Sequence, residues 1–79
     1  MSNLDKYNKV FREVFELEID QLNESLSYQS VSKWDSVGHM AMVALLEEEF
    51  DIMMDTDDII DFSSYEKGKE ILAKYEVVL

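Results

Sequence analysis

Apolar residues near the start of the chain recur at steps of three and four, which is the spacing of one face of an α-helix. The stripe consists of Leu4, Tyr7, Val10, Phe11, Val14 and Phe15. Ser2 or Asn3 can cap the start of such a helix, and Asp5 in its first turn suits the positive end of the helix dipole. The pattern therefore predicts a helix over 3–17 whose apolar stripe faces a core.

A long polar stretch follows, over 18–35, in which apolar residues are scattered without a regular period. These residues are Ile19, Leu22, Leu26, Tyr28, Val31 and Trp34. The apolar content is too high for a disordered linker. We therefore expect a connection that is held against the core, with a short helical turn near 20–24.

The next segment, 36–50, predicts a second helix with Asp35 as its N-cap. One face carries His39, Met42, Val43, Leu46 and Phe50, and the other carries Val37, Met40, Ala41, Ala44, Glu47 and Glu48. The first three turns are apolar all round, so this helix is either buried on every side or docked by a partner on one side. Full burial is hard to arrange in a chain of 79 residues, which favours the docking interpretation.

Two shorter helical patterns complete the chain. Asp55 or Thr56 can cap a short segment over 57–61. Ser63 with Glu66 three residues later matches a capping box, which predicts a last helix over 64–76. Gly68 inside that helix indicates close packing against another helix. With no proline and two glycines in the chain, the predicted class is all-α.

The net charge of −11 is concentrated in one part of the chain. Residues 35–61 hold nine acidic residues and no lysine or arginine. This field repels nucleic acid and anionic lipid and attracts basic partners, although a merely solubilising acidic face has the same composition. We expect one domain over 1–79, and a monomer. The absence of cysteine, of a membrane-spanning apolar run and of a signal-peptide pattern fits a cytoplasmic protein.

Candidate chemistry centres on Ser36. A serine at a helix N-terminus can carry a phosphate group that meets the free N–H groups of the first turn. His39 is the only histidine and is expected to be structural, so no catalytic triad can be assembled and enzyme activity is not expected. The acidic residues at 51–58 do not match a calcium-binding EF-hand loop, because Met53 occupies a ligand position and a glycine is missing at the turn. Weaker divalent-cation binding stays open.

Asp35-Ser36 followed by an aliphatic residue, with Leu45-Leu46-Glu47-Glu48-Glu49-Phe50 ending the same helix, resembles the acyl carrier proteins. The resemblance covers nearly the whole chain. It implies a four-helix bundle with a long loop between the first and second helices and a short third helix.

The resemblance also implies a function. Ser36 would receive 4′-phosphopantetheine from coenzyme A, added by a phosphopantetheinyl transferase whose magnesium Asp35 helps to hold. The arm would carry acyl or aminoacyl groups as thioesters to enzymes of fatty-acid, polyketide or related biosynthesis. Basic patches on those loading and processing enzymes would dock on the protein, and the docking residues would be Val37, Met40, Ala44, Glu47, Glu48 and Asp57.

Several positions depart from the family pattern. Val37 replaces the usual leucine, and Gly38 and Ala41 replace acidic residues that are common there. These differences point to a dedicated carrier, for example in polyketide, aminoacyl or surface-saccharide biosynthesis. Six aromatic residues are expected to fill the bundle and to leave little room for a long acyl chain: Phe11, Phe15, Phe50, Phe62, Tyr65 and Tyr75. The alternative function is a small acidic helical module that binds a basic partner without modification.

Overall fold

The computed structural model describes residues 2–79 and consists of four α-helices. They are α1 (Asn3–Phe15), α2 (Ser36–Phe50), α3 (Thr56–Asp61) and α4 (Tyr65–Ala73), and a single 3₁₀ turn spans Ile19–Gln21. Within 2–79 there is no β-strand, only one isolated bridge between Ser27 and Ser64. The predicted all-α class and the short third helix are confirmed.

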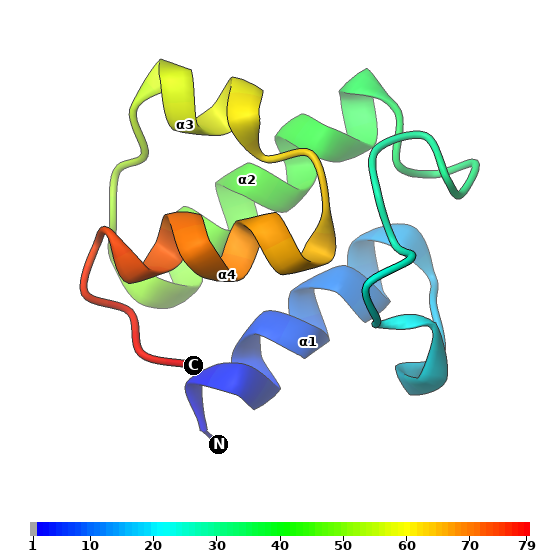
Figure 1. Cartoon of the computed structure of the whole chain (residues 1–79), viewed down its shortest axis with the longest axis horizontal. Helices are drawn as coiled ribbons and strands as arrows, with labels where there is room; N and C mark the ends of the chain where they lie inside the picture. Colours follow the sequence, from blue (N-terminus) through cyan, green and yellow to red (C-terminus); the bar gives the residue numbers. More distant parts are fainter. Residues whose placement is uncertain (1) are drawn as a thin grey trace.

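The helices surround one core, and the connection between α1 and α2 closes one end of it (Figure 1). The two termini lie near each other in this view, and Asn3 Nδ2 donates to the carbonyl oxygen of Val78 at 3.0 Å. Among the described residues, no helix combines the length and apolar character that crossing a membrane requires.

Helix α1 begins at a capping box in which Ser2 and Asp5 bond each other's backbone N–H groups. Its buried residues are Tyr7, Val10, Phe11 and Phe15. Leu4 was predicted to be in the stripe but is 37% exposed, because it lies in the first turn beyond the edge of the core. The helix ends two residues earlier than predicted, since Glu16 adopts a left-handed conformation (φ 54°) that turns the chain.

The 16–35 connection is held against the core as predicted, mainly through Leu26 and Trp34, which are 3% and 0% exposed. Leu22 and Val31 pack against the same core, whereas Ile19 and Tyr28 are exposed. The expected helical turn is the 3₁₀ turn, slightly before its predicted position.

Helix α2 has the predicted bounds, and it buries Met42, Val43 and Leu46. Helix α4 is shorter than predicted and ends at Ala73. The predicted capping residue of α4 is wrong by one position: Ser64, not Ser63, is the N-cap, and its hydroxyl accepts from the N–H of Lys67 at 3.0 Å. The bridge to Ser27 holds Ser64 in the extended conformation that an N-cap needs.

Aromatic side chains fill the centre of the bundle. Neighbouring rings lie 4.8–6.2 Å apart between centroids around Phe11, which contacts Tyr7, Phe15, Trp34, Phe62 and Tyr65. A Cβ atom at Gly68 would lie 2.1 Å from the Phe62 ring and 2.2 Å from the Tyr7 hydroxyl. The glycine therefore permits the close packing that the sequence indicated, against α1 and the segment before α4.

Candidate functional site

Ser36 is the first residue of α2 and its side chain is exposed. The preceding residue, Asp35, is the predicted N-cap: its Oδ1 accepts from the N–H of Gly38 at 2.8 Å, and its carbonyl accepts from the N–H of His39. The N–H groups of the first turn point out of the helix start and carry its partial positive charge. The Ser36 hydroxyl therefore projects from a rigid position at the positive end of a 15-residue helix.

His39 connects three parts of the protein. Trp34 Nε1 donates to His39 Nδ1 at 3.0 Å, so Nδ1 has no hydrogen, and Nε2 carries the hydrogen that it donates to the carbonyl oxygen of Ile59 at 2.8 Å. The ring thus joins the loop before α2 to α3. Both nitrogens are occupied, so His39 does not act as a base for Ser36, and its predicted structural role is confirmed.

The structure also explains why position 38 is a glycine, which the sequence did not reveal. A Cβ atom at this position would lie 1.9 Å from the carbonyl oxygen of Lys33 and 3.2 Å from the Phe15 ring. The absence of a side chain lets the loop backbone lie directly on the first turn of α2. Together with the Asp35 cap and the Trp34–His39 bond, this contact fixes the position of Ser36.

The outer face of α2 is an exposed apolar stripe. Val37 is 78% exposed and Met40 is 54% exposed, Ala44 continues the apolar stripe at helical spacing, and the acidic Glu48 follows on the same face. The opposite face is buried in the core. The structure thus presents the predicted docking residues Val37, Met40, Ala44 and Glu48 together on one surface.

The other two predicted docking residues lie in different settings. Glu47 is only half-exposed, because its Oε2 accepts from the N–H of Met54 at 2.9 Å and so closes the turn after α2. Asp57 is exposed in the first turn of α3. Glu47 therefore has a structural contact that the sequence did not indicate.

The next acidic residue, Asp58, is 5% exposed and does not contribute to the acidic surface. The Lys74 ammonium group and the Tyr75 hydroxyl each donate to its carboxylate at 2.5 Å. These hydrogen bonds, that of Lys74 foremost, hold the pKa of the Asp58 carboxyl below its ordinary value. The contact ties α3 to the end of α4.

An apolar groove of about 280 Å³ opens beside Ser36, between α2 and α3. Its lining comprises Tyr28, Ser36, His39, Met40, Ile59, Ile60, Phe62 and Ser63. Since this groove adjoins the exposed hydroxyl, we call it the Ser36 groove. Neither the groove nor the contributions of Tyr28, Ile59 and Ile60 was predicted, because the three segments that form it meet only in the folded chain.

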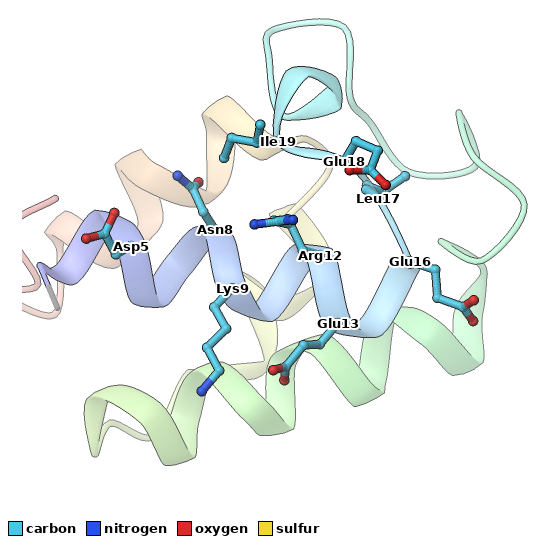
Figure 2. A pocket seen from close by; sticks show the side chains of 9 residues that line it. All are labelled: Asp5, Asn8, Lys9, Arg12, Glu13, Glu16, Leu17, Glu18 and Ile19. Carbon is cyan, nitrogen blue, oxygen red and sulfur yellow. The ribbon is translucent and has the colours of Figure 1, made fainter.

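A larger groove of about 730 Å³ runs along α1 (Figure 2). Asn8 and Arg12 leave the helix on the side of Ile19, whereas Lys9 and Glu13 leave it on the opposite side (Figure 2). Acidic and basic side chains both line this groove, and they leave α1 on different sides (Figure 2). The α1 groove therefore has no arrangement that selects a ligand of one charge.

Within residues 2–79 no cluster of three or more histidine and acidic side chains is arranged to hold a metal ion. The fold and the site thus define a small helical bundle with an exposed serine at the start of a helix whose outer face is apolar and acidic. The sequence matches no known protein-family model, and no curated protein is significantly similar to it.

Proposed function

We propose that this protein is a carrier of the acyl-carrier-protein type. It holds acyl or aminoacyl groups as thioesters on a 4′-phosphopantetheine arm attached to Ser36, and it presents them to enzymes of fatty-acid, polyketide or related biosynthesis. The observation that carries this proposal is the position of Ser36, exposed at the N-terminus of a helix with an unpartnered apolar face. The long 16–35 connection and the six-residue α3 agree with the helical arrangement of that family.

The residues around Ser36 fit the arm. An exposed hydroxyl can form the phosphodiester, and the partial positive charge of the α2 N-terminus stabilises the negative charge that the phosphodiester brings. Asp35 is exposed beside it, where it can help a transferase to hold magnesium. When bound, the arm supplies the thiol that forms the thioester, and the protein itself acts as a substrate of its partner enzymes.

The outer face of α2 is the proposed docking surface for the transferase and for the acyl-loading and acyl-processing enzymes. Val37, Met40 and Ala44 offer apolar contact, and Glu48 with Asp57 offers charge to basic side chains on the partner. Glu47 contributes from the edge, since part of its carboxylate is bound to the backbone of Met54. We place the protein in the cytoplasm as a monomer.

The test is incubation of the unmodified protein with coenzyme A and a promiscuous phosphopantetheinyl transferase, followed by intact mass measurement. We expect one arm to be added. Ser36→Ala abolishes the addition, whereas Ser63→Ala, which changes another serine of the same groove, retains it. An unmodified wild-type protein across several transferases contradicts the proposal.

A second candidate is a small acidic module that binds a basic partner without modification. The exposed apolar stripe with its acidic residues favours it, since such a surface needs no arm to dock. Under this alternative Ser36→Ala leaves binding to the partner intact, and Glu48→Lys weakens it. Under the carrier proposal both variants lose turnover, but only the effect of Glu48→Lys depends on salt concentration.

A further inference from the structure

The Ser36 groove lies against the aromatic core. Phe62, which lines the groove, is 1% exposed, and His39, which also lines it, is bonded to Trp34 and Ile59. Both rings lie close to the Trp34 ring, which in turn contacts Phe11 and Phe15. Packed aromatic rings therefore adjoin the groove on the side of the core.

The volume of the groove sets what it can hold. At about 280 Å³ it is slightly smaller than the range of about 300–1,000 Å³ that is typical of small-molecule pockets. The rim is open, because Met40 and Ile60 on its two sides are 54% and 72% exposed. A short apolar group that starts at Ser36 fits such a groove.

The chemistry of the arm places its most apolar segment next to Ser36. The pantoyl group, with two methyl groups on one carbon, follows the phosphodiester directly, and two amides and the thiol come after it. Amides lose their hydrogen bonds to water when they enter an apolar site, so they are disfavoured there. Transfer of the pantoyl methyl groups from water into the groove is instead favourable in free energy.

We propose that the Ser36 groove holds the pantoyl segment of the arm and that the thiol and its cargo stay outside the helical core. This inference rests on the proposed function. The apolar contacts come from Met40 of α2 and from Ile59 and Ile60 of α3. Since the rings of Trp34, Phe11 and Phe15 are in contact, we expect a cargo that does not need shelter in the core, which is a short or polar acyl group or an aminoacyl group.

Nuclear magnetic resonance of four forms of the protein tests this inference: unmodified, with the bare arm, acetylated and octanoylated. Mass measurement first establishes that each form is loaded. The chain has a single tryptophan, so its indole N–H gives one resonance, and Trp34 reports on the groove through its bond to His39. The methyl resonances of Ile59 and Ile60 report on the groove directly.

Attachment of the bare arm should shift the Ile59, Ile60 and Met40 methyl resonances and the Trp34 indole resonance. Val37 adjoins Ser36 but does not line the groove, so its shift measures the effect of the phosphodiester alone. The groove shifts should exceed that of Val37. Acetyl and octanoyl groups should leave the core methyl resonances of Val43, Leu46 and Leu72 where they are in the form with the bare arm.

A pair of variants separates the groove from the rest of the surface. Ile60→Ser should reduce the shifts at Met40 and Trp34 that accompany loading. Met53→Ser changes a residue that is 85% exposed and outside the groove, and it should keep those shifts. Both positions are exposed, so both variants are expected to fold.

Three results overturn the inference. Groove resonances that move no more than that of Val37 place the arm in solvent. Core resonances that shift in the octanoylated form, and shift less in the acetylated form, place the cargo in the core. A protein that no transferase loads overturns the proposed function and this inference with it, whereas a loaded protein with either of the first two results overturns this inference alone.

Discussion

At Gly38 the backbone of the preceding loop lies directly against the first turn of α2. The hydrogen bond between Trp34 and His39 also holds this loop against α2. Both features depend on residues that lie five positions apart across the start of a helix, where apolar periodicity gives no signal. The sequence could therefore predict that His39 is structural, but neither its partners nor the reason for Gly38.

Gly38→Ala should destabilise the protein, because the new Cβ atom lies 1.9 Å from the carbonyl oxygen of Lys33 and the loop must move. Overpacking costs about 1–3 kcal/mol, and alanine returns about 1 kcal/mol through its helix propensity, so we expect a net loss of up to about 2 kcal/mol. Urea unfolding of the variant and of wild type measures this difference in the free energy of unfolding. Val37→Ala, at an exposed neighbouring position, is the control and should stay within about 0.5 kcal/mol of wild type. A stabilised Gly38→Ala variant contradicts the described contact.

Glu47 and Glu48 are adjacent in the sequence but differ in what they contact. Glu47→Ala removes the carboxylate that receives the N–H of Met54, and it should lower the free energy of unfolding by about 1 kcal/mol. Glu48→Ala should change it by no more than about 0.5 kcal/mol. Thermal or urea unfolding of the two variants gives the comparison, and equal effects would show that the Glu47 contact adds no stability.

At the scale of elements, the sequence predicted α2 correctly at both ends, because Asp35 is a good N-cap and the apolar pattern stops at Phe50. The ends of α1 and α4 were predicted too late. In the described chain α1 and α2 end at the acidic residues Glu16 and Asp51, which adopt the left-handed conformation. Glu76, in the turn after α4, adopts the same conformation. Glycine or asparagine is the usual signal for such an end, so acidic residues there conceal it.

The apolar residue after each of these acidic residues supplies the missing explanation. Leu17, Ile52 and Val77 each donate a backbone N–H to the carbonyl five residues earlier, and each packs on the core. This bond is the mark of a Schellman motif. The burial of the apolar side chain offsets the cost of the left-handed residue, and that burial is visible only once the core is known.

The attachment of α3 depends on pH through Asp58. The pKa of this carboxyl is lower in the folded protein than its ordinary value of 3.8, so its stabilising contribution is fully present above that pH and is lost as the pH falls through the lowered pKa. Asp58→Asn should therefore destabilise the protein at neutral pH, and the difference from wild type should shrink in acid.

Urea unfolding at neutral pH and below pH 3.8 measures that difference. Asp57→Asn is the matched control, since Asp57 is the exposed neighbour in the same helix turn. Its difference from wild type should be small at both pH values. A difference for Asp58→Asn that is the same in acid and at neutral pH contradicts the tie between α3 and α4.

At the scale of the whole molecule, the net charge of −11 opposes compaction. Only three ion pairs with acidic side chains involve the described lysines and arginines, and they are Lys33–Glu16, Lys69–Glu66 and Lys74–Asp58.

The all-α class, the number of helices and the apolar outer face of α2 followed from the sequence, because each depends on local periodicity. The Ser36 groove did not, because it depends on how the helices meet.

Sodium chloride should raise the midpoint of thermal unfolding, since it shortens the Debye length from about 8 Å at 0.15 M to about 3 Å at 1 M and screens the repulsion. A variant with Glu48→Gln and Glu49→Gln removes two of the exposed acidic charges and should respond less to salt. If both proteins show the same rise of the unfolding midpoint with salt, the repulsion of these two acidic side chains is not its cause.

The proposed attachment of a phosphopantetheine arm to Ser36 can be tested by the mass of the protein purified from its native cells. We expect a mass that exceeds that of the bare chain by one arm, with or without its acyl group, and a peptide map that places the excess on Ser36. A protein with the mass of the bare chain, or with its modification on another residue, contradicts it.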